Sequence, residues 1–221
     1  GVEWEMMDRS PFDKGKSLQL KENNERCRYL KDDEIIKLID ACPPYLKPIV
    51  QCAILSGMRK GEILSLKWDQ IRNGFIYLRK TKNKEPRQVP INEELAAVFR
   101  AIRKEQHLKS EYVFTFNDKP LGNIKKGFKA ALVRAGIQDF RFHDLRHTFA
   151  SQVIMRGGSL KDVQELLGHK TMTMTLRYSH LSSDHKRNAV NLLNGLTGIV
   201  IPSISPVTRL SDKAAQAVQI Q

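Results

Sequence analysis

The chain has 221 residues, 41% of them hydrophobic, which is enough for one sizeable domain with a packed core. No apolar run approaches the roughly 20 residues that cross a bilayer, and the N-terminal segment lacks a secretory signal pattern, so we expect a soluble cytoplasmic protein with no membrane partner. Three cysteines without a CxxC pair argue against a disulfide framework or a zinc cluster.

Net charge is the strongest bulk signal. The sequence has 37 Lys and Arg against 24 Asp and Glu, a net charge of +13. Residues 59–104 hold 12 basic and 5 acidic residues, a net of +7, so more than half of the excess lies in about a fifth of the chain. A solvated basic surface is the plain explanation, but charge concentrated in this way favours nucleic acid as the partner.

Three regions follow one another along the chain. Residues 1–29 are mixed in charge and carry Pro, Gly and an Asn pair, which indicates a linker or the remnant of a preceding domain. Regular patterns run over residues 30–194, which we expect to form one domain. Residues 195–221 combine Gly, Pro and Ser with scattered apolar residues and are expected to form a tail without a core of its own.

Helical periodicity dominates the central region. Apolar residues recur at helical spacing, and glycines or prolines end the segments. The predicted helices cover residues 30–42, 45–56, 60–67, 93–107, 123–136, 143–156, 159–168, 171–179 and 183–194. Strand-forming residues at 75–79 and 87–91 flank the polar segment KTKNKEP and predict a β-hairpin, while 112–116 predicts a short strand. The fold class is therefore α+β, mainly α-helical, with a small antiparallel sheet.

The densest group of reactive side chains lies between His143 and Tyr178. In HDLRHT, His143 and Arg146 are three residues apart, on one face of a predicted helix. Arginine offers a planar fork for phosphate oxygens, and histidine titrates near neutrality. His169 follows a glycine at a helix end, and Tyr178 lies in TLRYSHL. Each has an ordinary alternative when taken alone: an ion pair, a helix cap, a helix-end partner or a half-buried core tyrosine.

A metal site is the competing explanation for these histidines. His143 and His147 are four residues apart, but the zinc-protease pattern HExxH needs Glu after the first histidine, and Asp144 stands there. No third ligand is apparent except His169. We therefore predict no metal site and expect His147 to pack or to hydrogen-bond behind the reactive group.

Two basic positions upstream fit the same anionic partner. In SGMRKGEILSL, Arg59 lies at the start of a predicted helix, where its guanidinium and free backbone N–H groups can face an anion. Lys82 lies in the polar turn of the predicted hairpin, with Lys84 beside it as an alternative. A surface arginine and a solvated lysine are the plain explanations for these two positions.

The segments SGMRKGEILSL, TKNKEPRQVPI, HDLRHTFAS and LGHKTMTMTLRYSHL, in this order and at this spacing, resemble the tyrosine recombinases of the phage integrase family. The resemblance runs from about Leu30 to Leu193 and implies the catalytic-domain fold of that family. The catalytic residues that it implies are Arg59, Lys82, His143, Arg146, His169 and Tyr178. Basic residues near them are candidate DNA contacts: Lys60, Lys80, Lys84, Arg87 and Arg141. Family members resemble two-domain clamps, and here only residues 1–29 precede the catalytic region, so we expect a fragment or half of the clamp.

The chemistry that the resemblance implies is phosphoryl transfer without a metal, a cofactor or ATP. Tyr178 attacks a DNA phosphodiester and gives a 3′-phosphotyrosyl link with a free 5′-hydroxyl. Deprotonating a phenol of pKa about 10 at pH 7 costs about 4 kcal/mol, so an acceptor is useful. His143 is the candidate, with His169 positioning the phosphate or sharing the proton. The two arginines neutralise charge on the phosphate, and Lys82 protonates the leaving oxygen.

The predicted partner is double-stranded DNA. The resemblance implies a homotetramer on two duplexes, compatible with a monomer without DNA, in which the tail docks on a neighbouring protomer. The predicted function is site-specific recombination that integrates or excises a mobile element of a bacterium or phage. Two alternatives remain: a type IB topoisomerase-like nicking-closing enzyme, and a non-catalytic DNA-binding module.

Overall fold

The computed structural model describes residues 28–78, 86–106, 110–117, 119–181 and 190–197. The chain divides into two compact units, residues 1–181 and 182–221. Of the second unit only 190–197 are described: Val190 and Asn191 are helical and 192–197 form turns, with hydrogen bonds such as Leu193 N to Val190 O at 3.0 Å. Most of the helix predicted at 183–194 and most of the tail lie outside the described residues.

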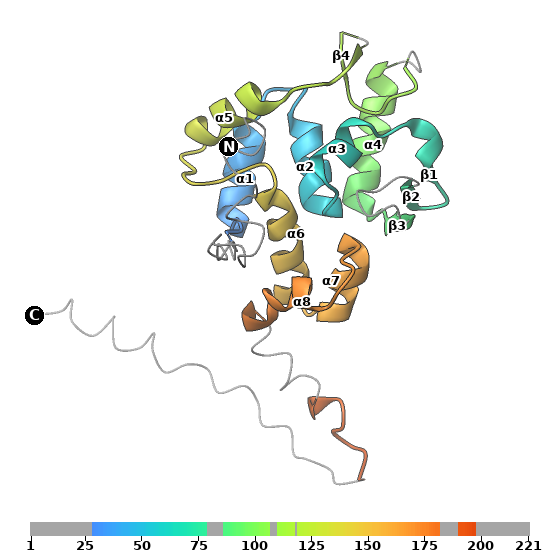
Figure 1. The fold of residues 1–221 in the computed structure, drawn as a ribbon, viewed down its shortest axis with the longest axis vertical. Helices are drawn as coiled ribbons and strands as arrows, with labels where there is room; N and C mark the ends of the chain where they lie inside the picture. The colour runs from blue at the N-terminus through green and yellow to red at the C-terminus, as the bar shows by residue number, and fades with distance from the viewer. Residues whose placement is uncertain (1–27, 79–85, 107–109, 118, 182–189, 198–221) are drawn as a thin grey trace, which may run out of the picture. The chain divides into compact units, whose positions relative to one another are not determined.

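The first unit is mainly helical (Figure 1). Within it, α2 packs against both α4 and α6. Helix α1 packs on α5, and α6 also contacts α7. The helices are α1 (Asp32–Ala41), α2 (Lys47–Ser56), α3 (Lys60–Leu64), α4 (Glu93–Gln106), α5 (Lys125–Arg134), α6 (Asp144–Met155), α7 (Leu160–Leu167) and α8 (Thr173–Leu176). Short 3₁₀ turns cover η2 (Trp68–Gln70) and η3 (Ser179–Leu181). None of the described helices is long and apolar enough to cross a membrane.

Local signals in the sequence account for several helix ends. The Asn92 side chain accepts a hydrogen bond from Leu95 N at 2.9 Å at the start of α4, and Ser159 accepts one from Asp162 N at 3.0 Å at the start of α7. Gly57 and Gly168 end α2 and α7 in the left-handed conformation, with φ of 62° and 63°. Gly57 lies two residues before Arg59, and Gly168 directly precedes His169. These helix ends therefore help to place two of the candidate catalytic residues.

Two small antiparallel sheets complete the first unit. One has the order β1 (Ile71–Arg72), β2 (Phe75–Leu78), β3 (Arg87–Pro90), and the other pairs β4 (Thr115–Phe116) with β5 (Lys119–Pro120). Ile76 pairs with Val89 and both are buried, so β2 and β3 pack one face on the core. The same register pairs Leu78 with Arg87, which brings Arg87 to the end of the sheet beside residues 79–85.

The observed elements confirm the predicted fold class, mainly helical with small antiparallel sheets. Three predicted elements are clearly shorter than expected, and one of them is the helix predicted at 60–67, which ends at Leu64. The strand predicted at 112–116 keeps only Thr115–Phe116, and the helix predicted at 171–179 keeps only Thr173–Leu176 with a following 3₁₀ turn. Alternating threonines in TMTMT lower the helix propensity of the latter segment, because β-branched side chains crowd the preceding turn.

The buried side chains form two clusters. The larger one joins residues of α1 to α5, the three-stranded sheet and the start of α6, and includes Leu38, Ile49, Ile76 and Leu95. The smaller one lies between α6, α7 and the segment after α8, and consists of Phe149, Ala150, Ile154, Val163, Leu167 and Tyr178. Cys42 and Cys52 are buried free thiols, and burial raises their pKa to about 11 and about 12, so they stay protonated.

Candidate active site

Three guanidinium groups converge on the carboxylate of Glu62 and on the end of α7. Arg59 Nη1 donates to Glu62 Oε1 at 2.9 Å, and Arg87 Nη2 donates to Glu62 Oε2 at 2.7 Å. The Glu62 side chain is 8% exposed and that of Arg87 is 9% exposed. Arg87 also donates to the Leu167 carbonyl, and so does Arg146. One carbonyl at the end of α7 therefore receives hydrogen bonds from two arginines that belong to different elements.

Arg146 is held by backbone carbonyls rather than by a carboxylate. Its Nη1 donates to Gly57 O at 2.6 Å and its Nη2 to Leu167 O, so it bridges the ends of α2 and α7. Burial, followed by the charges of Arg87 and Arg59, lowers its pKa to about 9, which leaves it charged at pH 7. Burial also lowers the pKa of Arg87. The site thus concentrates positive charge that one carboxylate offsets only in part.

At the N-terminus of α3, one of the backbone N–H groups that the sequence suggested to be free is already occupied. The Arg59 N–H donates to Glu62 Oε2 at 2.9 Å, because Glu62 lies three residues on and reaches back to the N-cap. The Arg59 side chain is 21% exposed. Any anion that binds here therefore meets the guanidinium of Arg59, while the first N–H is occupied.

The start of α6 places two histidines one turn apart. His143 is the N-cap and is exposed, whereas His147 is half-buried. Their rings meet edge to face, with centroids 5.4 Å apart. Burial and then the charge of Arg146 lower the pKa of His143, and burial followed by His143 lowers that of His147 to about 4. Both imidazoles are consequently neutral at pH 7.

Tyr178 is joined to His147, not to His143. The Nδ1 atom of His147 lies 2.6 Å from the Tyr178 hydroxyl. Tyr178 is 1% exposed and belongs to the smaller buried cluster. His147 was predicted to pack or to hydrogen-bond behind the reactive group; the hydrogen bond is present, and its partner is the hydroxyl of Tyr178, a member of that group.

His169 stands on the turn between α7 and α8. Its backbone N–H donates to Gln164 O at 3.0 Å, and its Nδ1 lies 2.9 Å from the hydroxyl oxygen of Thr175, a buried residue of α8. Burial, and then the charge of Arg146, lower the pKa of His169 to about 4. The structure therefore brings Arg59, Arg146, His143, His169 and Tyr178 to one region built on α3, α6, the end of α7 and the segment of α8.

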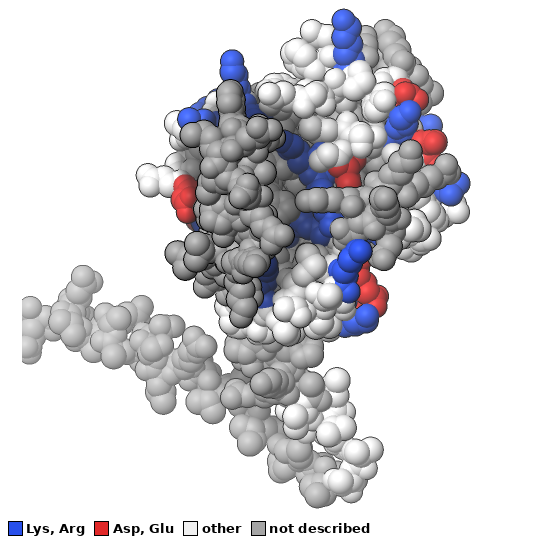
Figure 2. Space-filling view, in the orientation of Figure 1, with Lys and Arg blue, Asp and Glu red and all other residues white. Residues whose placement is uncertain are grey.

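The basic residues predicted to contact DNA differ in their positions. Lys82, Lys80 and Lys84 lie outside the described residues. Lys60 and Arg141 are exposed, as a direct contact requires. Arg87 is directed inward to Glu62 and Leu167, so the structure gives it a bracing role within the arginine cluster instead of a surface position. Figure 2 shows Lys and Arg atoms gathered in the hollow at the middle of one face of the first unit.

Sequence reasoning missed Glu62 and Thr175. Glu62 had a readable signal, because a Glu three residues after a helix N-cap is the capping-box pattern. Thr175 had none, since its contact with His169 depends on how α8 folds back toward α7. Among the residues that the structure describes, no group of three or more His, Cys, Asp or Glu side chains is placed to hold a metal ion.

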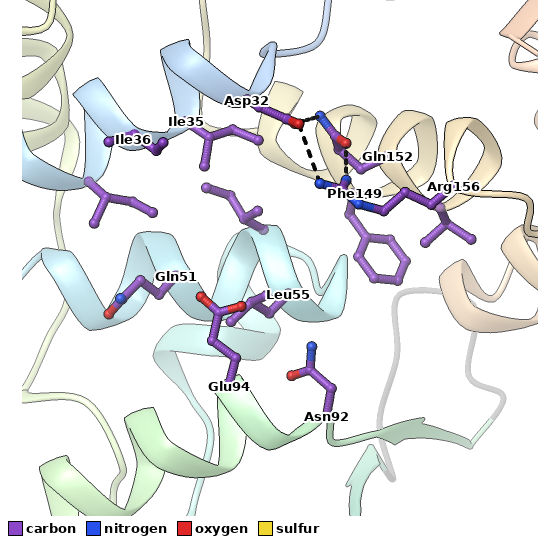
Figure 3. Close-up of a pocket in the computed structure, with 13 residues that line it drawn as sticks. Asp32, Ile35, Ile36, Gln51, Leu55, Asn92, Glu94, Phe149, Gln152 and Arg156 are labelled. Atoms are coloured by element: carbon purple, nitrogen blue, oxygen red, sulfur yellow. Dashed lines mark hydrogen bonds and ion pairs between the residues drawn. The ribbon is translucent and has the colours of Figure 1, made fainter.

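A separate hollow of about 550 Å³ opens between α1, α2, the start of α4 and α6 (Figure 3). Its wall is mainly apolar, with Ile35, Ile36 and Leu55 facing Phe149. At its rim the Asp32 carboxylate accepts a hydrogen bond from Gln152 at 2.9 Å and lies 3.5 Å from Arg156. None of the six predicted catalytic residues lines it, so it is not part of the reactive group.

Residues 28–185 match the phage integrase family, which is most of the chain. The chain belongs to this family. The integrase of Salmonella phage P22 is 32% identical over 221 residues, covering 92% of this chain and 55% of that protein. The catalytic domain of bacteriophage HP1 integrase has the same fold, with a TM-score of 0.61, 30% identity, and coverage of 78% of this chain and 98% of that one.

Lambda integrase provides structures of family members on DNA. A lambda integrase dimer bound to a COC′ core site has a TM-score of 0.58 and 25% identity, covering 72% of this chain and 49% of that one. A lambda integrase tetramer bound to a Holliday junction, 24% identical over 66% of this chain and 48% of that one, shares the fold with a TM-score of 0.57. The chain spans about half the length of the curated integrases that it matches.

Proposed function

We propose that the protein is a site-specific DNA recombinase that breaks and rejoins DNA through a 3′-phosphotyrosyl intermediate. The observation that carries the proposal is the assembly, around the end of α7, of Arg59 and Arg146 with a hydrogen-bonded pair of tyrosine and histidine. Family membership and the fold of the HP1 catalytic domain support the same activity. The net charge of +13 suits a polyanionic substrate.

The proposed reaction exchanges one phosphodiester for another. The Tyr178 oxygen attacks the phosphorus and loses its proton to a nearby acceptor, a tyrosyl phosphodiester forms, and the bond to the 5′-oxygen breaks. Arg59 and Arg146 neutralise the charge that builds on the nonbridging oxygens. His143 and His169, which flank this group, position the phosphate or share the proton. We propose Lys82 as the donor of the proton that the leaving 5′-oxygen takes up.

The second transfer reverses these steps with a new 5′-hydroxyl. Because the energy of the broken bond is kept in the phosphotyrosine, rejoining needs neither ATP nor another cofactor. An enzyme of this kind acts on double-stranded DNA and, we propose, exchanges strands as a homotetramer on two duplexes. The tail at 195–221 would join neighbouring protomers, and the apolar hollow of Figure 3 is a surface of suitable chemistry for it.

Integration or excision of a mobile element is the biological role that we propose, in the cytoplasm of a bacterial host. The relatives in phages P22, 186 and HP1 are integrases, which supports this choice over chromosome-dimer resolution. A type IB topoisomerase-like activity is the alternative with the same chemistry. Relaxation of supercoiled DNA without a specific site, and no exchange between paired sites, would favour that alternative.

A nicked suicide substrate tests the proposal directly. A duplex carrying the cognate site, with a nick placed so that a short 5′-hydroxyl strand diffuses away, traps the covalent adduct. We expect the wild-type protein to form an adduct resistant to denaturation, and Tyr178→Phe to form none while still binding the duplex. If neither protein forms the adduct on its own attachment DNA, the enzyme proposal is wrong and the DNA-binding module is favoured.

A further inference from the structure

The segment that carries the nucleophile has little support of its own. The helix α8 has four residues, Thr173–Leu176, and its side chains Met174 and Leu176 are 41% and 48% exposed. Only Thr175 within it is buried, and Tyr178 follows two residues after its end. A helix this short is not stable by its own hydrogen bonds, so contacts with the rest of the protein must decide where Tyr178 lies.

Two histidines make those contacts. His169 Nδ1 lies 2.9 Å from the Thr175 hydroxyl oxygen and His147 Nδ1 lies 2.6 Å from the Tyr178 hydroxyl. His147 stands on α6, whose residues Leu145, Thr148 and Phe149 are buried on either side of it, so its backbone is held firmly. The imidazole is therefore a fixed point, and the phenol is the group whose position depends on it.

We propose that His147 positions the nucleophile, with its Nδ1 accepting the hydrogen bond of the Tyr178 hydroxyl and aligning the phenol oxygen for attack. This inference rests on the proposed function and adds a residue to its site. The family resemblance gave the role of acceptor to His143, whereas in this structure the atom at the hydroxyl belongs to His147.

The charges around His147 keep it able to accept. Burial and the neighbouring His143 ring, together with Arg177 and Arg146, lower its pKa, and Asp144 acts in the opposite direction, for a pKa of about 4. A neutral imidazole has one nitrogen without a proton, and only such a nitrogen can accept from a phenol. Its pKa lies about six units below the ~10 of a phenol, so His147 holds the proton-bearing hydroxyl and does not remove its proton in the absence of DNA.

Asparagine and glutamine distinguish this role from a merely structural one. The Asn side-chain oxygen falls near the place of histidine Nδ1, whereas that of Gln falls near Nε2. We expect His147→Ala to slow adduct formation at saturating DNA by about 100-fold, the loss typical of a misplaced reacting group, with little change in DNA affinity. His147→Asn should recover at least tenfold of this loss, and His147→Gln should not. Equal rates in Asn, Gln and Ala variants would overturn the positioning role.

A substrate with sulfur in place of the leaving 5′-oxygen distinguishes a residue that positions the nucleophile from one that protonates the leaving group. Sulfur leaves without being protonated, so this substrate should relieve a Lys82→Ala defect and leave that of His147→Ala unchanged. Relief of the His147→Ala defect to the same degree would show that the residue acts on the leaving group, and the inference would be wrong. Failure of wild type to form any adduct would instead overturn the proposed function.

Nitrogen NMR of the histidines tests the contact without any DNA. In protein labelled with ¹⁵N-histidine, His147 should appear as the tautomer with a hydrogen-bonded, unprotonated Nδ1. Tyr178→Phe should shift that Nδ1 resonance and leave the resonances of His180, which is exposed, in place. If Tyr178→Phe leaves the His147 resonance unchanged, the hydrogen bond is absent in solution and the inference fails whatever the activity.

Discussion

The arginine half of the site and the tyrosine half are built in opposite ways. Arg59, Arg87 and Arg146 come from α3, β3 and α6 and are linked through Glu62 and the Leu167 carbonyl. Tyr178 of the other half follows a four-residue helix with exposed apolar side chains, and its buried cluster has six members. The arginine half, which we propose meets the phosphate, is thus braced from several elements, whereas the proposed nucleophile packs in a small cluster and has His147 at its hydroxyl.

This difference suits the order of events that the proposed reaction requires. Charge stabilisation is most effective when the groups are fixed before the substrate arrives, because no energy is then spent on arranging them during the reaction. Tyr178, by contrast, is 1% exposed, so the segment that covers it must open before a DNA phosphate can reach the hydroxyl that His147 holds. The four-residue helix before it can make such a movement at low cost. The predictions below ask how far each half depends on its own contacts.

The largest effect is expected from Arg146→Lys. A lysine keeps the charge but cannot bridge the Gly57 and Leu167 carbonyls while presenting further donors to a phosphate. We expect single-turnover cleavage to slow by about 10²–10³-fold, as when a fixed donor to a developing oxyanion is lost. Arg134→Lys is the matched control, because Arg134 also donates to a backbone carbonyl, that of Ala41, but is exposed. Equal rates in Arg146→Lys and wild type would remove Arg146 from the site.

Glu62→Gln should loosen the arginine half without removing an arginine. It leaves the nearly buried Arg87 without its carboxylate, and removing one partner of such a pair typically costs about 3 kcal/mol of the free energy of unfolding. Urea unfolding measures this loss, and cleavage should slow as Arg59 loses its support. The control is Glu111→Gln, whose partner Lys67 is at the surface, and its expected loss is much smaller because solvent screens an exposed ion pair. Similar losses in both variants would show that Glu62 braces nothing.

The arginine half and the tyrosine half differ in how much of each could be predicted from the sequence. Helix ends at Asn92, Ser159 and Gly168 follow local rules and could be read from neighbouring residues. Glu62 was readable too, since it lies three residues after Arg59. The contact of Arg87 with Leu167 joins residues 80 positions apart, and no local rule specifies it. That is why a residue expected at the DNA surface proves to lie inside.

The three-stranded sheet gives an example of a local signal that was present but too short to predict a strand. The strand β1 was missed although Asn73–Gly74, with φ of 50° and 75°, is a pair typical of two-residue hairpin turns. The signal was present but only two residues pair beyond it, too few for a periodic pattern. In the tyrosine half, His147 was expected to pack or to hydrogen-bond behind the site, but its partner depends on how the segment of Tyr178 packs against α6, which no local pattern specifies.

Acid should weaken the tyrosine half, whereas the arginines keep their charge as the pH falls. His147 and His169 have pKa values lowered from 6.5 to about 4, so between these limits the unfolded chain binds protons that the folded chain does not. The free energy of unfolding is therefore lost as pH falls from about 6.5 to 4. Because both rings are partly exposed, we expect about 1 kcal/mol from each.

The measurement is the urea midpoint at pH 7.5, 6 and 5, compared between wild type and a His147→Asn variant. Asparagine does not titrate, so the variant should lose the part of the pH dependence that comes from His147 and retain the part that comes from His169 and His143. Carboxylates also titrate at the acid end, and their contribution is common to both proteins. An identical pH dependence in the two proteins would show that His147 is not held neutral by its surroundings.

The last prediction concerns Gly168, where the two halves meet. Its φ of 63° is unfavourable for any residue with a side chain, and a Cβ here would lie 3.0 Å from Arg87 Cδ and 3.0 Å from Arg87 Nη1. Arg87 is held by Glu62 and Leu167, so it cannot withdraw freely. We expect Gly168→Ala to lower the free energy of unfolding by about 1–2 kcal/mol. Gly61→Ala in α3 is the control, because a Cβ at this position has no neighbouring heavy atom within 4 Å. It should raise the free energy of unfolding by up to about 1 kcal/mol. The cleavage rate of Gly168→Ala is compared with its folded fraction at the assay temperature. A fall in rate larger than the smaller folded fraction accounts for would show that the arginine cluster and the segment of His169 and Tyr178 are coupled through this glycine. If both variants cleave as wild type does, the two halves are independent at this point.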